Sequence, residues 1–177
     1  MSNLFTTIMN KTNNIDVSKW NVSNVKNMGC MFCESEFTGE NGDISEWDVS
    51  KVDNMEWMFG NSEFTGENAD LSNWDVSNIT NMHGVFNGCE NFDCNLSKWD
   101  VSKVITTTFM FKRCKKFTGK GLENWNITNI KTMSFMFYDC IKFNCDLSSW
   151  DVSKVNDIDD MFYNCNSLKN KPTWYKK

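Results

Sequence analysis

Eight cysteines are the residues of this 177-residue chain with the widest choice of chemistry, because a thiol can bind a metal, form a disulfide or act as a nucleophile. Four of them follow a phenylalanine by three residues and recur at intervals of 25 or 26 residues: Cys89, Cys114, Cys140 and Cys165. This regular spacing favours small buried side chains in a repeated position. We therefore predict four structural buried thiols, with a metal or redox role as the alternative.

Cys30 and Cys33 form a CxxC motif. The two residues between them belong to the apolar pattern described below, and no second CxxC lies at zinc-ribbon spacing. The motif therefore gives only a weak indication of zinc, and we predict no metal site and no cofactor.

A polar column follows a repeated tryptophan directly, with Asp in four repeats and Asn in two. Its members are Asn21, Asp48, Asp75, Asp100, Asn126 and Asp151. Stacked carboxylates suggest a cation such as calcium, but the two Asn residues favour side chains that bond the backbone of their own turn. His83, the single histidine, occupies a variable position that we expect to face solvent. Without a Ser/His/Asp set or a phosphate-binding loop, we predict no catalytic residues and no enzyme.

An internal repeat positions all of these residues, and repeats decide the architecture of a chain. Its most regular feature is a tryptophan that recurs every 25–27 residues at Trp20, Trp47, Trp74, Trp99, Trp125 and Trp150. The consensus around it is [IL]-S-x-W-D-V-S-x-V-x-x-M-x-x-M-F, with another Phe five or six residues later. Eight positions per repeat are apolar, and Thr107 is the one exception among them. A single repeat cannot bury eight apolar side chains, but stacked repeats can. The sequence therefore predicts a structural tryptophan ladder within a stacked core.

Two short elements are expected in each repeat. Val52, Met55, Met58 and Phe59 lie at i, i+3, i+6 and i+7, which is typical of one face of a short helix. The segment from the last Phe of the repeat to the Ile/Leu-Ser pair is bounded by Gly, Asn and Asp, which favours a brief strand. We predict an α/β repeat solenoid, a leucine-rich-repeat-like stack of about six repeats, each with a short parallel strand and a short helix. Residues 1–14 would form an N-terminal cap, 15–168 the solenoid and 169–177 a C-terminal cap.

The run W-D-V-S-x-V-x-x-M-x-x-M-F-x-x-C-x-x-F resembles the BspA-like leucine-rich-repeat surface proteins, above all the branch of mycoplasma lipoproteins, which also occurs in large DNA viruses. The resemblance extends from Val17 to about Leu168. It implies a non-enzymatic solenoid used in adhesion, partner binding or surface decoration, and it supplies no catalytic residues. The chain differs from the bacterial surface members in its eight cysteines and in a first segment without a secretion signal.

Candidate partner-binding residues lie two positions after the first Met of each repeat. The occupants of this slot are Cys30, Trp57, Gly84, Phe109, Phe135 and Asp160. The three aromatic occupants either widen the buried stripe of the predicted helix or form an apolar interaction patch. We name Trp57, Phe109 and Phe135 as candidate anchors for a protein partner.

Composition restricts the function further. A net charge of −5 argues against nucleic-acid binding, and no segment approaches the roughly 18 apolar residues of a membrane-spanning helix. We expect an intracellular or virion protein in preference to a cell-surface one. The predicted function is a non-enzymatic structural or protein–protein interaction module, a virion- or capsid-associated component of a large DNA virus; the alternative is a secreted or cell-surface adhesin of the BspA-like type.

Overall fold

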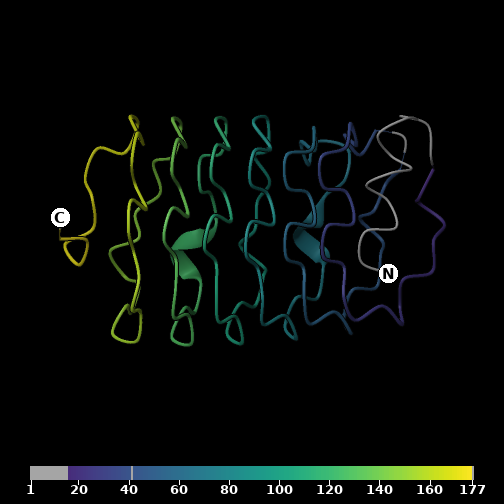
Figure 1. The fold of residues 1–177 in the computed structure, drawn as a ribbon, viewed down its shortest axis with the longest axis horizontal. Helices are drawn as coiled ribbons and strands as arrows, with labels where there is room; N and C mark the ends of the chain where they lie inside the picture. The colour runs from purple at the N-terminus through teal and green to yellow at the C-terminus, as the bar shows by residue number, and fades with distance from the viewer. Residues whose placement is uncertain (1–15, 41, 177) are drawn as a thin grey trace.

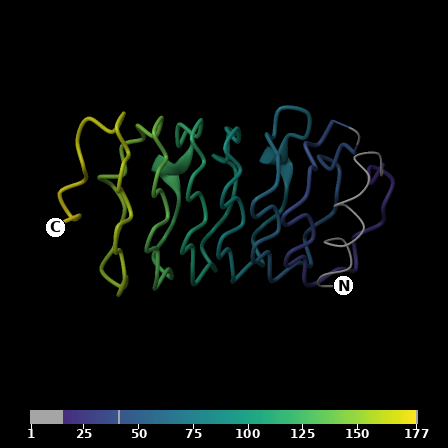
Figure 2. The same cartoon turned by 45° about the horizontal axis from the view of Figure 1, so that its top comes forward.

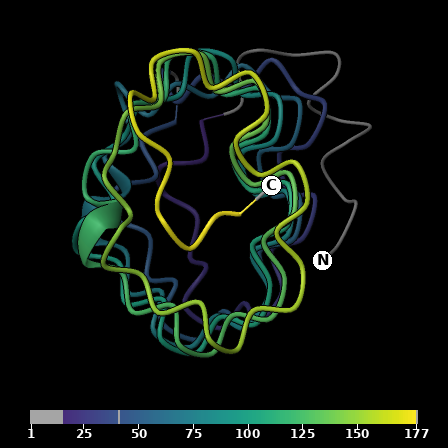
Figure 3. The same cartoon turned by 90° about the vertical axis from the view of Figure 1, so that its left-hand side faces the viewer.

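The computed structural model describes residues 16–40 and 42–176. The chain winds into a row of similar coils that follow one another along the longest axis of the molecule (Figure 1). The tilted view shows the same succession of neighbouring coils (Figure 2). Viewed along the row, the coils superimpose around a common interior (Figure 3). Each coil corresponds to one sequence repeat, and the repeat is therefore the structural unit.

The predicted α/β repeat solenoid, with a strand and a helix in every leucine-rich-repeat-like unit, is wrong. Within the described ranges the regular elements are two 3-10 helices of three residues, η1 (Leu71–Asn73) and η2 (Leu122–Asn124), and there is no α-helix and no strand. Parallel pairing between coils is reduced to isolated single-residue bridges. They join Asn27, Asn54, Asn81, Thr106, Thr132 and Asp157 in one column.

The segment predicted as a helix is a chain of turns, because left-handed residues interrupt it. In the second repeat the N–H of Met58 donates to the Met55 carbonyl, and the N–H of Gly60 donates to the Trp57 carbonyl, both at 3.0 Å. Trp57 and Asn61 each have a φ of 55°, and an L-residue in this conformation cannot continue a right-handed helix. The same two slots have positive φ in every repeat: Cys30, Glu34, Trp57, Asn61, Gly84, Gly88, Phe109, Arg113, Phe135, Asp139, Asp160 and Asn164.

Alternate backbone N–H groups of these turns donate to the next coil. The N–H of Cys30 reaches the Glu56 carbonyl at 2.8 Å, and that of Phe32 reaches the Met58 carbonyl at 2.7 Å. Just before the turns the N–H groups donate to the preceding coil instead, as from the Asp53 N–H to the Lys26 carbonyl at 2.8 Å. The neighbouring coil therefore satisfies backbone groups that a helix would satisfy internally.

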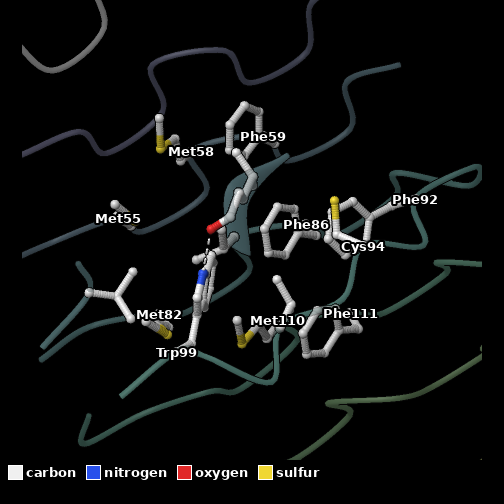
Figure 4. Close-up of a cluster of buried hydrophobic side chains, with 14 of the residues drawn as sticks. Met55, Met58, Phe59, Met82, Phe86, Phe92, Cys94, Trp99, Met110 and Phe111 are labelled. Carbon is white, nitrogen blue, oxygen red and sulfur yellow. Dashed lines mark hydrogen bonds between the residues drawn. The ribbon is translucent and has the colours of Figure 1, made fainter. Parts of the chain in front are cut away.

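The core consists of aromatic and aliphatic columns that run from coil to coil. Phe59, Phe86 and Phe111 are fully buried, and their ring centroids are 5.6 and 5.7 Å apart along the column. The close-up shows these three rings in a row, with methionines of the same repeats beside them (Figure 4). Because each ring packs on the equivalent ring of its neighbours, one repeat completes the core of the next.

The tryptophan ladder also links the coils by hydrogen bonds. The indole N–H of Trp99 donates to the Leu71 carbonyl at 2.8 Å (Figure 4), and the same carbonyl accepts the backbone N–H of Trp74 at 3.1 Å. Both lone pairs of this buried oxygen are therefore used. Equivalent indole bonds are donated by Trp47, Trp74, Trp125, Trp150 and Trp174.

Trp174 is a seventh member of the tryptophan ladder and lies inside the segment predicted as a C-terminal cap. Its ring stacks on Trp150 with centroids 6.4 Å apart, and its indole N–H donates to the Leu147 carbonyl at 3.0 Å. Trp174 and Tyr175 both pack against the last buried phenylalanine, Phe162. The predicted N-terminal cap, 1–14, lies outside the described residues.

Candidate functional site

The four column thiols lie inside the stack as hydrogen-bond donors. Cys89, Cys114 and Cys140 are fully buried, and Cys165 is 8% exposed. The thiol of Cys114 donates to the Phe86 carbonyl at 3.0 Å, which also accepts the backbone N–H of Cys89. Cys89, Cys140 and Cys165 make the same thiol bond to the preceding coil. In the thiol column, as in the tryptophan ladder, one carbonyl oxygen therefore accepts two hydrogen bonds, one from a side chain and one from a backbone N–H.

The surroundings of the column favour the protonated thiol. Burial raises the pKa of Cys89 and of Cys165 to about 12, and it raises the pKa values of Cys114 and Cys140 well above the ordinary range. A thiolate has no proton to donate to the neighbouring carbonyl oxygen, so its negative charge would face that oxygen without solvent. Among the described residues no group of three His, Cys, Asp or Glu side chains is placed to hold a metal ion.

Alkylation of the native protein is expected to leave Cys89, Cys114 and Cys140 unmodified, because the reactive thiolate is suppressed and the sulfur atoms are inaccessible. The partly exposed Cys145 provides the internal control: burial raises its pKa to about 12 as well, so its faster reaction would reflect the accessibility of its sulfur atom. Peptide mass spectrometry after iodoacetamide treatment, with and without denaturant, checks this. Rapid native modification of Cys114 at the rate of Cys145 would show that the column opens or that its thiols are ionised.

The carboxylates that follow the ladder tryptophans are bonded within their own turns. Oδ1 of Asp48 accepts the Ser50 backbone N–H at 3.1 Å and the Ser50 hydroxyl at 2.6 Å. These bonds lower the pKa of Asp48. Asn126 makes the same pair of bonds to Thr128, so the turn does not require a charge. This arrangement accounts for the Asp/Asn column without a cation.

A continuous row of aromatic side chains lies on the outside of the turn segment, and we call it the outer strip. It comprises Trp57, His83, Phe109, Phe135, Tyr138 and Tyr163, together with Lys112. Trp57, Phe109 and Phe135 are left-handed residues. The left-handed conformation directs the side chain of this slot away from the core columns, and all three are partly exposed.

Ring contacts connect the outer strip from coil to coil. Ring centroids are 5.8 Å apart between Trp57 and His83, 5.4 Å between His83 and Phe109, and 5.1 Å between Phe109 and Phe135. Tyr138 then continues the row from Phe135 to Tyr163, which is 55% exposed. These spacings are typical of interacting aromatic pairs.

Two glycines make room for the indole of Trp57. A Cβ atom added at Gly84 would lie 2.9 Å from two atoms of that ring, and one added at Gly60 would lie 2.5 Å from a third. Gly84 occupies the same slot as Trp57 and Phe109, so this repeat lacks an aromatic ring of its own there. His83, the preceding residue, fills the gap and keeps the row continuous.

Two titratable groups give the outer strip its polar character. Nζ of Lys112 lies 5.0 Å from the ring centroid of Phe109, 5.5 Å from that of Phe135 and 5.1 Å from that of Tyr138, within cation–π range. Burial lowers the pKa of His83, and the Glu56 carboxylate opposes this shift. The strip therefore combines aromatic area, which is enriched at protein interfaces, with the Lys112 ammonium group.

The structure brings the three predicted anchors into one surface, although Trp57 reaches Phe109 only through His83. Sequence reasoning missed His83, Lys112, Tyr138 and Tyr163. Tyr138 and Tyr163 occur three residues after the anchor slot and 25 residues apart, which is the signal that could have identified them. His83 gave no such signal, because its slot varies in every repeat.

Neither a curated protein nor a solved structure matches the chain. In the described part of the chain no helix has the length and apolar character needed to cross a membrane. One family model matches twice, over residues 1–68 and 61–175, and the two matches together cover nearly the whole sequence. The resemblance to mycoplasma-type repeat proteins is thereby confirmed at the level of the family, and the chain belongs to the family described as "Mycoplasma protein of unknown function, DUF285".

Proposed function

We propose that the chain is a non-enzymatic protein-interaction module that contacts a protein partner through the outer strip. The observation that carries the proposal is the continuity of partly exposed rings from Trp57 to Tyr163 across five coils. Clustered aromatic side chains on a surface mark interaction sites, and aromatic residues dominate the binding energy at such sites. A rigid row of stacked rings also loses little conformational freedom on binding.

The chemistry of the strip supports a protein partner. The rings of Phe109 and Phe135 are nearly parallel, at 24°, and stack on each other, so one face of each is covered while both side chains remain partly exposed. Ring edges and the Lys112 ammonium group suit a surface with apolar side chains and carbonyl or carboxylate oxygens. The net charge of −5 does not favour a nucleic acid as partner.

The combined substitution of Trp57, Phe109 and Phe135 by Ser is expected to abolish recovery of the partner in a pull-down with cross-linking from the native source. The far-ultraviolet circular dichroism spectrum should remain nearly unchanged, because these side chains lie outside the core columns. A matched control replaces Ile105 and Ile141, two exposed apolar residues outside the strip, by Ser and should bind normally.

Two results would contradict the proposal. Normal recovery by the triple variant would place the contact elsewhere on the molecule. Unfolding of the triple variant would mean that the three rings stabilise the coils instead of serving a partner. Single substitutions at Phe109 and Phe135, each compared with Lys112→Ala, then identify the ring whose loss unfolds the protein.

Two settings are proposed for this module, and they predict different locations. The resemblance to BspA-like proteins and the mycoplasma description of the family support a cell-surface adhesin. The cysteine-rich composition supports a component of a virus particle, which was the first expectation from the sequence. Mass spectrometry of surface-labelled cells and of purified particles separates the two, since the protein should be enriched in only one fraction.

A further inference from the structure

Cys30 and Cys33 stand apart from the thiol column. Both are partly exposed, and both lie in the outward-facing turn of the first described coil. Neither thiol donates to a carbonyl of a neighbouring coil in the described part of the structure, whereas the thiols of Cys89, Cys114 and Cys140 do. Their role therefore differs from that of the structural thiols.

The other repeats show that the two slots occupied by Cys30 and Cys33 face each other. Cys30 corresponds to the left-handed residue of the outer turn, and Cys33 lies three residues later. In the fourth repeat the equivalent pair is Phe109 and Lys112, with Nζ 5.0 Å from the ring centroid. In the fifth it is Phe135 and Tyr138, with centroids 5.8 Å apart.

The second repeat gives the closest measure of this proximity. A Cβ atom placed on Gly60, the equivalent of Cys33, would lie only 2.5 Å from Cε3 of Trp57, the equivalent of Cys30. Three repeats of different composition thus place these two slots next to each other on the turn. The proximity of the two slots follows from the turn backbone that the repeats share.

In the first repeat these two slots hold the two thiols. The N–H of Cys33 approaches the Cys30 carbonyl at 3.5 Å, as in a four-residue turn, and the Cα atoms that bound such a turn are less than about 7 Å apart. A disulfide requires a Cα separation of about 4.4–6.8 Å. Burial and a hydrogen bond with the adjacent Cys33 thiol raise the pKa of Cys30 to about 12, and the Glu56 and Glu34 carboxylates add to this shift.

We infer that Cys30 and Cys33 are a redox-active pair that closes an intrachain disulfide by exchange with a low-molecular-weight disulfide such as oxidised glutathione. The Cys33 thiol loses its proton and attacks a glutathione sulfur, which releases one glutathione thiolate and leaves a mixed disulfide on Cys33; the raised pKa of Cys30 makes that thiol the weaker first nucleophile. The Cys30 thiol then loses its proton, attacks the Cys33 sulfur and releases the second glutathione. The two cysteines lose two protons and two electrons, and the small disulfide gains them.

The local structure favours the second step. Met31 and Phe32 lie between the cysteines and are anchored in core columns, with 6% and 0% exposure. The turn is therefore fixed, and the second sulfur is already beside the first when the mixed disulfide forms. The cross-link would covalently close the first outer turn of the stack and leave the six other cysteines free.

The test incubates the native 177-residue chain with oxidised glutathione at pH 8.5, then unfolds it, blocks the remaining thiols with iodoacetamide in denaturant and maps them by peptide mass spectrometry. We expect the loss of two alkylatable thiols and a peptide containing Cys30 and Cys33 that is lighter by two hydrogen atoms. Dithiothreitol should restore both thiols. Cys30→Ser and Cys33→Ser are the controls, and each should retain glutathione on the remaining cysteine, because the second step is impossible.

Three outcomes would overturn the inference: stable glutathione adducts on the wild-type pair, a cross-link between chains, or two thiols that alkylate freely and never oxidise. The wild-type measurement is sufficient for this decision even where a serine variant fails to fold. Binding of a partner by the outer strip plays no part in the readout, so the two proposals fail independently.

Discussion

Replacing Trp99 by Ala is expected to lower the free energy of unfolding by about 3–5 kcal/mol, the usual range for deleting a large buried aromatic side chain. The ring of Trp99 stacks on Trp125 with centroids 6.5 Å apart and also contacts Phe86, so its removal opens a cavity shared by three coils. It also removes one of the two donors to the Leu71 carbonyl. Urea denaturation followed by circular dichroism measures the difference.

Two further substitutions separate packing from hydrogen bonding. Trp99→Phe keeps most of the ring volume and removes the indole N–H, and should therefore cost less than Trp99→Ala. Trp174→Ala should also cost less, because Trp174 is partly exposed and stacks on a ladder tryptophan on one side, at Trp150. Equal losses for Trp99→Ala and Trp174→Ala would show that stability does not depend on a neighbour on both sides.

Thr107→Val is expected to act in the opposite direction and raise the free energy of unfolding by about 1–3 kcal/mol, the cost of burying a hydroxyl without a hydrogen bond. Thr107 occupies a slot that holds methionine in four of the other repeats. It is fully buried, and its Oγ1 has no hydrogen-bond partner among the described residues. Valine fills the same space and removes the unpaired oxygen.

Thr106→Val is the matched control for this stabilisation. Oγ1 of Thr106 accepts the hydroxyl proton of Thr132 at 2.9 Å, so the same chemical change one residue earlier removes a bond that exists. We expect a loss of about 1 kcal/mol there. If Thr107→Val proves neutral or destabilising in the same denaturation experiment, an ordered water molecule satisfies the Thr107 hydroxyl.

The core could be predicted from the sequence because burial depends on which residues recur. Trp74, Phe86 and Met82 repeat at fixed intervals, and all three are buried. The local elements could not be predicted, because a spacing of three and four residues is produced equally by a helix and by consecutive four-residue turns. What distinguishes them is the left-handed residue, and the first left-handed slot holds Cys30, Trp57, Phe109 or Phe135 in four of the six repeats, residue types that carry no such preference.

Glycine gave the clearest hint, and Asn or Asp in the same slots, as at Asn61 and Asp139, adds to it. Gly84 and Gly88 are four residues apart and have φ values of 62° and 76°, so the third repeat marks both left-handed slots with the residue that adopts them most easily. Two glycines inside a predicted helix of about two turns argue against that helix. The periodic apolar residues outweighed this signal, and the predicted helix was wrong for that reason.

The candidate site was predicted only in part, for a related reason. Trp57, Phe109 and Phe135 share one slot, so comparison of the repeats identifies them directly. Lys112 and His83 belong to different slots and join the strip through contacts that depend on the turn geometry. Lys112 lies three residues after Phe109 and would be its neighbour on a helix as well, whereas His83 contacts Phe109 of the next coil and could not be grouped with it from a repeat alignment.

The direction of the side-chain hydrogen bonds has a consequence for biosynthesis. The indole of Trp125 and the thiol of Cys140 both donate to a carbonyl of the coil before their own, and so do the other indoles and column thiols described above. A nascent chain emerges with its N-terminal residues first, so each such coil leaves the ribosome with buried carbonyl oxygens whose second hydrogen bond only the following coil can donate. We therefore expect folding during translation to lag one repeat, about 25–27 residues, behind the emerging chain, and a ribosome stalled at any repeat boundary should present one unfinished coil.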